Sequence, residues 1–197
     1  MKHSVSDKTL SIYPEIPGGD GKPPYVGQVS YLPNNFRIGS KYIRKPDRIE
    51  GFGEKTIWKH CDAQRAAAWH DDKGGSQKGS NLLMKFTISG KNFLHCGDLG
   101  HILDKGTLNK LGQIDVLFIP VGGNYTIDAL EAKTIVDALS PIIVFPMHYK
   151  TDVLEFPIAA KESYLNLIND LVEVTSNEIE LNESDFTNSK TIILNYE

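Results

Sequence analysis

The sequence lacks a long hydrophobic run, a basic segment and a cysteine framework. Its longest apolar stretches are about eight residues, against the roughly 20 that span a bilayer, so no transmembrane helix is predicted. The net charge is -4 and lysine and arginine do not cluster, so nucleic acid and anionic membranes are not among the expected partners. The first 24 residues lack the apolar core of a signal peptide. Two cysteines, Cys61 and Cys96, cannot make a disulfide framework, so a reducing cytoplasm is the expected location.

The chain is long enough for one domain, or for one domain with an extension. It has 197 residues, of which 40% are apolar, enough to build a sizeable core. The polar segment Met1–Pro24 ends in GGDGKPP and predicts an irregular arm or linker. Between Tyr25 and Ile43 the pattern is broken and allows two short strands around a turn at Pro33-Asn34.

The second half of the chain alternates strands with helices. Ile114–Val121 and Pro141–Met147 are continuous apolar runs of strand length, which is typical of strands buried on both faces. Helices are predicted at Leu103–Leu111, Ile127–Leu139 and Ala159–Val172. Further strands are predicted at Thr56–Trp58, Ala63–Trp69, Leu82–Ile88, Phe93–Cys96, Glu178–Leu181 and Thr191–Tyr196. This order predicts an α/β layered fold.

Three polar residues directly follow apolar runs. His70 follows AAAW, Asp98 follows NFLHCG, and His148 follows PIIVFPM. If the strands lie side by side, the three side chains converge at one edge of the sheet, where α/β folds bind ligands. Two imidazoles and a carboxylate are good ligands for zinc or a similar ion, which makes hydroxide available near neutral pH. The same residues also fit ordinary turn and cap positions, and the spacing alone leaves both interpretations open.

Four strings occur in an order that resembles a known family. They are AWHDDKGGSQKGSN, FLHCGDLGHIL, IDVLFIPVGGNYTIDALEA and PIIVFPMHYKT. Together they resemble the C-terminal half of metallo-β-lactamase-fold hydrolases, in the branch related to L-ascorbate-6-phosphate lactonase, over roughly Ile43–Pro157. The resemblance implies an αββα sandwich that is incomplete in its N-terminal half. It divides the chain into an atypical arm, residues 1–42, and a metallo-β-lactamase-like domain, residues 43–197.

The resemblance also implies roles for individual residues. His70 matches a ligand of the first metal, Asp98 the carboxylate that bridges two metals, and His148 a ligand of the second. Asp98 and His148 are therefore the expected catalytic residues, with zinc or manganese as the cofactor. The residues expected to wall the substrate pocket or to support the ligands are His101, Gly122, Gly123, Thr126 and Lys150.

The sequence departs from the family in one respect. The family signature HxHxDH, which supplies most of the remaining ligands, occurs nowhere in this sequence. Two hypotheses follow. The first is a metal-dependent hydrolase of a small-molecule lactone, ester or phosphoester, whose ligand set is incomplete unless a second copy or another chain complements it. The alternative is a non-catalytic remnant that serves as a binding or assembly domain, so the sequence leaves open whether the chain is an enzyme.

Overall fold

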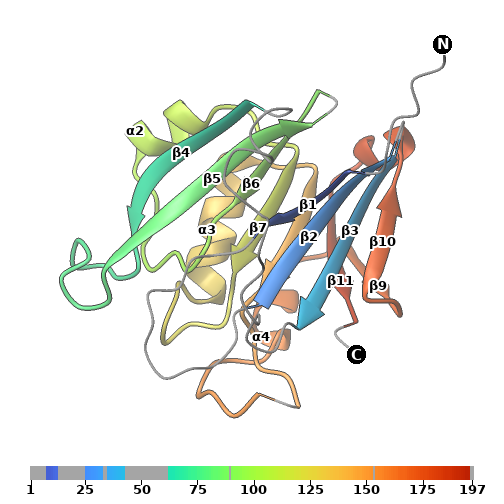
Figure 1. Cartoon of the computed structure of the whole chain (residues 1–197). Helices are drawn as coiled ribbons and strands as arrows, with labels where there is room; N and C mark the ends of the chain where they lie inside the picture. Colours follow the sequence, from blue (N-terminus) through green and yellow to red (C-terminus); the bar gives the residue numbers. More distant parts are fainter. Residues whose placement is uncertain are drawn as a thin grey trace, which may run out of the picture. The chain divides into compact units, whose positions relative to one another are not determined.

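The computed structural model describes residues 8–12, 25–32, 35–42, 62–88, 90–152 and 154–195 (Figure 1). The chain divides into two compact units, and the first comprises Met1–His60, Glu173–Thr187 and Leu194–Glu197. The second comprises Cys61–Val172 and Asn188–Ile193. The strand expected at Thr56–Trp58 and the residue Cys61 lie outside the described residues. The division expected between residues 42 and 43 stays a prediction.

A four-stranded antiparallel sheet has the order β1-β2-β3-β10. Its strands are β1 (Lys8–Ile12), β2 (Tyr25–Leu32), β3 (Asn35–Tyr42) and β10 (Glu178–Leu181). The first strand lies inside Met1–Pro24, so the prediction of an irregular arm is wrong over that stretch. Leu10 and Ile12 alternate with polar neighbours there, the pattern of a half-buried strand, but the run is too short to outweigh the surrounding polar sequence.

A seven-stranded sheet has the order β4-β5-β6-β7-β8-β11-β9. Its strands are β4 (Asp62–Trp69), β5 (Ser80–Ile88), β6 (Lys91–His95), β7 (Val116–Pro120), β8 (Ile143–Met147), β9 (Leu171–Val174) and β11 (Lys190–Leu194). The strand β5 is antiparallel to both of its neighbours, while β6, β7, β8 and β11 are parallel. The strands β4, β6, β7 and β8 therefore end at the same edge of the sheet.

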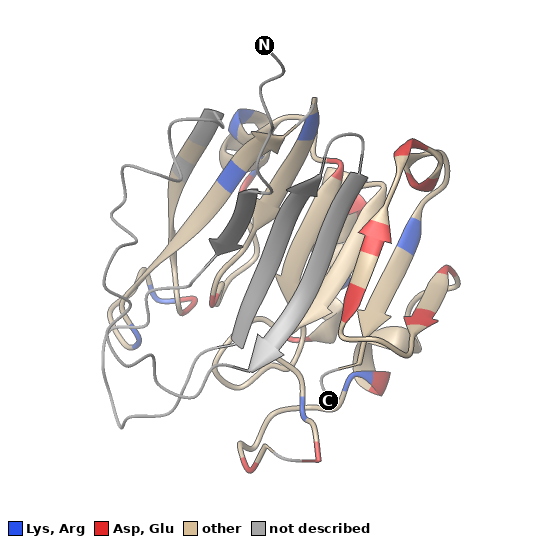
Figure 2. Ribbon diagram, turned by 45° about the vertical axis from the view of Figure 1, so that its right-hand side comes forward, with Lys and Arg blue, Asp and Glu red and all other residues tan. Residues whose placement is uncertain are grey.

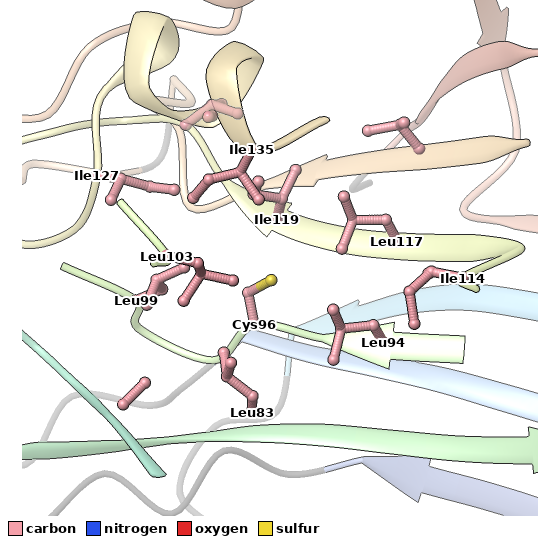
Figure 3. Close-up of a cluster of buried hydrophobic side chains, with 14 of the residues drawn as sticks. Leu83, Leu94, Cys96, Leu99, Leu103, Ile114, Leu117, Ile119, Ile127 and Ile135 are labelled. Carbon is pink, nitrogen blue, oxygen red and sulfur yellow. The ribbon is translucent and has the colours of Figure 1, made fainter. Parts of the chain in front are cut away.

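One face of this sheet packs against helical and loop residues. Leu83, Leu94 and Leu117 come from three neighbouring strands and are fully buried. Figure 3 shows them in one cluster with Ile127 and Ile135, which come from the loop before helix α3 and from the helix itself. These contacts fix the central strands and the loop before α3 as a single packed layer.

The opposite face of the sheet carries a row of stacked rings. The ring centroids of Phe86 and Phe93 lie 5.2 Å apart, and those of Phe118 and Phe145 lie 5.1 Å apart. His95 continues the row, with its ring 5.7 Å from that of Phe118. Because β7 and β8 are buried on both faces, their sequences are continuously apolar, as the sequence analysis predicted.

Three α-helices are described, α2 (Lys105–Leu111), α3 (Ala129–Leu139) and α4 (Glu162–Leu165). The first two confirm the predicted helices. Of the predicted helix Ala159–Val172 only Glu162–Leu165 is helical, and the rest of the prediction is wrong, because the chain turns after Leu165 and enters strand β9 at Leu171. None of the described helices is long and apolar enough to pass through a bilayer.

Charged side chains are unevenly spread over the ribbon. Acidic residues gather along β9, β10 and the short 3₁₀-helix η1 (Glu183–Phe186), as Figure 2 shows. The described strands β4 to β8 form an α/β arrangement with α2 and α3, which confirms the predicted α/β class. The strands β4, β6 and β8 end at one edge of the large sheet, and His70, Asp98 and His148 follow them there.

Candidate functional site

Three predicted site residues follow strands that end at one edge of the large sheet. His70 follows β4, Asp98 lies three residues beyond β6, and His148 follows β8. The loop after β6 contacts the end of β4, because the amide N–H of Gly100 donates to the carbonyl oxygen of Trp69 at 3.0 Å. The structure therefore places all three residues at the C-terminal edge of the strands, where α/β folds bind ligands.

His70 is held tightly by backbone contacts. Its amide N–H donates to the carbonyl oxygen of Gly79 at 3.1 Å, which closes the loop between β4 and β5. On the other side lies Gly100, where an added Cβ atom would come within 2.2 Å of the His70 carbonyl group. The ring atom Nε2 of His70 is buried and has no hydrogen-bond partner among the described residues. A buried imidazole nitrogen without a partner is unfavourable, and metal coordination is one way to satisfy it.

Asp98 sits in a turn that one side chain clamps. The Oδ1 atom of Asn81 accepts the amide N–H of Asp98 at 3.0 Å, and Nδ2 of Asn81 donates to the carbonyl oxygen of Cys96 at 2.8 Å. Gly97 between them has φ of +58°, which glycine adopts without a Cβ penalty. These two hydrogen bonds of Asn81 fix the backbone of the turn from which the Asp98 side chain projects.

His148 has a left-handed backbone, with φ of +54°, which is uncommon for a residue other than glycine. Its carbonyl oxygen faces Gly122, where an added Cβ atom would lie only 2.1 Å away. The hydroxyl of Thr126 lies 3.5 Å from Nδ1 of His148 and donates its own proton to the carbonyl oxygen of Ile127 at 3.3 Å. Because the Thr126 hydroxyl donates its proton elsewhere, its oxygen can accept a proton from Nδ1 of His148. The lone pair of His148 is then on Nε2.

The pKa of His148 is influenced by the charges of other residues at this edge of the sheet. Burial is the largest influence on the pKa of His148 and lowers it, while the Asp98 carboxylate raises it. The charges of His70 and Lys78 lower the same pKa further, so that overall it lies below its ordinary value. The four side chains thus share one electrostatic environment.

The donor types suit a divalent metal, but the described residues do not complete a site. Among them no three His, Cys, Asp or Glu side chains lie close enough together to hold a metal ion. Two imidazoles and one carboxylate match the ligands that zinc prefers, and Nε2 of His70 has no other partner. His70, Asp98 and His148 therefore fit part of a ligand set, and the rest of that set lies outside the described residues if a metal binds here.

The remaining predicted residues line the same loops. Gly122, Gly123 and Thr126 are buried in the turn between β7 and α3, where the amide N–H of Gly123 donates to the carbonyl oxygen of Ile127 at 3.1 Å. The Nζ atom of Lys150 donates to the carbonyl oxygen of Phe156 at 3.0 Å and so holds the next loop.

His101 contacts backbone groups through both nitrogens of its ring. Its Nδ1 atom lies 2.9 Å from the carbonyl oxygen of Ile102, and its Nε2 atom accepts the amide N–H of Trp69 at 3.1 Å. Both ring nitrogens therefore have a backbone partner. The bond to Trp69 places the His101 ring beside His70, and a substrate could bind the ring only by replacing one of its two backbone contacts.

Three residues at this edge were missed by the sequence analysis. Asp71 lies in the loop after His70, and its carboxylate accepts four backbone N–H groups, those of Lys73, Gly75, Gln77 and Lys78. Burial raises the pKa of Asp71, but the four hydrogen bonds outweigh it and lower the pKa to about 2. Asn81 and Lys78 are the other two. The signal that could have revealed this loop is Asp71 placed shortly before Gly74-Gly75, because an aspartate side chain commonly accepts hydrogen bonds from the backbone of a glycine-containing turn.

Comparisons with known proteins identify the family of the chain. A family model described as "Beta-lactamase superfamily domain" matches residues 21–148, and so begins before Ile43, where the resemblance was placed. A UPF0173 metal-dependent hydrolase from Carboxydothermus hydrogenoformans is 32% identical over 124 residues, which cover 59% of this chain and 52% of the relative. Another from Thermococcus onnurineus is 36% identical over 110 residues, covering 54% of this chain and 48% of the relative.

A solved structure shares the fold. It is a metallo-beta-lactamase superfamily protein from Thermotoga maritima, with a TM-score of 0.61 and 31% identity, covering 70% of this chain and 66% of that one. The chain spans about half the length of the curated relatives it matches. Because the family model covers well over half of the sequence, the chain belongs to the beta-lactamase superfamily domain family and has the metallo-β-lactamase fold.

Proposed function

We propose that this chain is part of a metal-dependent hydrolase in which His70, Asp98 and His148 are metal ligands. The observation that carries the proposal is the buried Nε2 atom of His70, which lacks a partner at the same edge of the sheet as Asp98 and His148. The relatives named metal-dependent hydrolases support it, as does the name of the Thermotoga maritima protein, which proposes a Zn-dependent hydrolase.

The metal would be zinc or manganese, and when bound it would supply an activated water for attack on a lactone, ester or phosphoester. A substrate like that of the L-ascorbate-6-phosphate lactonase branch is the finer proposal, and the cytoplasm is the proposed location. The printed sequence contains no HxHxDH motif. The remaining ligands are therefore proposed to come from outside the described residues, from a second copy or from a complementing chain.

The residues of this chain would orient the site. Asn81 would fix Asp98 through its hydrogen bond to the Asp98 amide. Thr126 would keep the proton of His148 on Nδ1 and leave the Nε2 lone pair available to the metal. Asp98 and His148 are the residues proposed to act closest to the reacting atoms, while Gly122 and Gly123 form the wall beside them.

The test is the metal content per chain of the purified protein after dialysis against zinc or manganese. We expect about one equivalent or less, because His70, Asp98 and His148 are only part of a ligand set and do not by themselves lie close enough together to hold a metal. Asp98→Ala combined with His148→Ala should abolish binding, and Asp137→Ala, an exposed carboxylate on α3, is the matched control. Unchanged metal binding in Asp98→Asn would show that Asp98 is not a bridging ligand.

The second candidate is a non-catalytic binding or assembly domain of the same fold. The observation that favours it is that no three candidate ligands among the described residues lie close enough together to hold a metal. Undetectable metal, together with no hydrolysis across panels of lactones and phosphoesters, would support this candidate and exclude the enzyme for the isolated chain.

A further inference from the structure

The loop between β4 and β5 is built more rigidly than its sequence suggests. Asp71 is only 4% exposed, and its Oδ1 atom accepts the amides of Lys73 and Gly75 at 2.9 and 2.8 Å. Its Oδ2 atom accepts those of Gln77 and Lys78 at 3.0 and 2.6 Å. One carboxylate therefore organises the whole loop, and the backbone of Lys78 is one of the points that it fixes.

The side chain of Lys78 reaches from this loop to the loop after β7. Its Nζ atom donates to the carbonyl oxygen of Asn124 at 2.5 Å and lies 5.8 Å from the ring centroid of Tyr125. The first loop contains His70, and the second contains Gly122, Gly123 and Thr126. The ammonium group thus bridges the two loops that border the proposed site.

The contrast with Lys73 shows why this placement is unusual. Lys73 lies in the same loop, and its Nζ atom pairs with the Asp72 carboxylate at 2.9 Å in exposed surroundings. The described contacts of the Lys78 ammonium are instead a carbonyl oxygen and an aromatic ring. An ammonium has three N–H donors and a carbonyl uses one, so the Lys78 side chain, which is exposed like that of Lys73, keeps donors for a further group.

The neighbourhood of Lys78 suits a small anionic molecule. The ring of Tyr125 meets that of Phe156 edge-on at a centroid distance of 5.9 Å, which gives an aromatic wall beside the ammonium. The loop that Lys78 contacts at Asn124 also carries Thr126, whose hydroxyl lies 3.5 Å from Nδ1 of His148, so the ammonium borders the proposed reacting centre. A lysine on a fixed backbone binds carboxylate or phosphate as a point charge.

We propose that Lys78 binds the anionic group, a carboxylate or a phosphate, of the molecule that the site hydrolyses, with Tyr125 packing against the adjoining part. Lys78 is then a substrate-binding residue, and Asp71 is a positioning residue that acts through the Lys78 backbone. The assignment of the molecule as a hydrolysed ester or lactone rests on the proposed function, whereas binding of the anion itself does not.

Binding is tested first, with inorganic phosphate and succinate titrated calorimetrically into the purified full chain. Loss of a charge-assisted hydrogen bond is worth about 10- to 100-fold in affinity, so Lys78→Met should weaken binding by that factor. Lys78→Arg should retain most of the affinity, and Lys73→Met is the matched control and should bind as the wild type does. Preference for phosphate or for succinate identifies which anion the site selects.

Kinetics tests the link to hydrolysis, with 4-nitrophenyl hemisuccinate as the anionic ester and 4-nitrophenyl butyrate as its neutral match. Lys78→Met should raise KM for the anionic ester about 10-fold or more and leave the neutral ester unaffected. If the wild type hydrolyses neither ester yet binds an anion through Lys78, the proposed function fails and the anion site stands. Equal affinity of wild type and Lys78→Met for both anions, or an equal effect on both esters, overturns the assignment.

Discussion

The amide N–H of Asp98 donates a hydrogen bond to Oδ1 of Asn81 across 3.0 Å, which ties the turn after β6 to the start of β5. Asn81→Ala removes this bond and the bond to the Cys96 carbonyl oxygen. We expect the free energy of unfolding to fall by about 1–3 kcal/mol, because buried polar groups lose their partner. Metal affinity should fall as well, since the Asp98 carboxylate is no longer fixed.

Chemical denaturation and metal titration measure the two effects separately. Thr87→Val is the matched control, because Thr87 is on the same strand and donates to Oδ1 of Asn92, away from the site. It should lower stability without changing metal affinity. An Asn81→Ala protein that binds metal as the wild type does would show that the clamp does not position Asp98.

Gly100 allows the two site loops to approach each other. A Cβ atom at this position would lie 2.2 Å from the carbonyl oxygen of His70, a contact that only a backbone shift relieves. Gly100→Ala should therefore cost at least about 2 kcal/mol of stability and displace His70, as overpacked substitutions do. Gly106→Ala, in the first turn of α2, is the control: its Cβ atom would meet only a side-chain oxygen, Oδ1 of Asp104 at 3.1 Å, so it should cost much less stability than Gly100→Ala. Equal stability of the two variants would contradict the expectation.

The central strands could be predicted because strands that are buried on both faces have continuously apolar sequences. The strands β7 (Val116–Pro120) and β8 (Ile143–Met147) are apolar at every position, since both of their faces are covered. The order of strands and helices then placed His70, Asp98 and His148 at one edge. The helix expected at Ala159–Val172 was wrong because apolar residues at helical spacing there belong to two elements, and Leu171 and Val172 lie in β9.

The residues that support the site were harder to predict, because they act through backbone groups. Asn81 could have been found, since the pairing of Met84 with His95 places Asn81 opposite Asp98 if the register continues. The role of Asp71 required knowing that the following loop folds back around it. Lys78 reaches a residue 46 positions away, and no local pattern encodes such a contact.

The carboxylate of Asp71 should leave a signature in the acid stability of the protein. Its pKa is lowered from 3.8 to about 2 in the folded chain, so its contribution is present above pH 4 and is lost as the pH falls through about 2. Asp71→Asn removes the charge and places an amide group opposite backbone N–H donors. We expect a flatter stability profile between pH 4 and 2, and faster amide hydrogen exchange at Gly75 and Gln77. Unchanged exchange at these amides would exclude the proposed role of Asp71.

His95 should govern the stability at mildly acidic pH. It is 2% exposed, its Nδ1 atom accepts the amide N–H of Gly97 at 3.0 Å, and burial lowers its pKa from 6.5 to about 4. Between these two values the unfolded chain binds a proton that the folded chain does not. Stability is therefore full above pH 6.5 and falls by about 3 kcal/mol as the pH drops toward 4.

His95→Asn tests this expectation, because the asparagine oxygen can accept the Gly97 amide and does not titrate in this range. The variant is expected to be less stable at pH 7.5, since it loses the ring contact with Phe118. Its stability should fall less between pH 7 and 4.5 than that of the wild type, with the lowered pKa of His148 contributing to the remaining slope, as urea denaturation at each pH would measure. Parallel profiles for the two proteins would mean that another group carries the pH dependence, because removing a buried neutral imidazole must remove its own proton linkage.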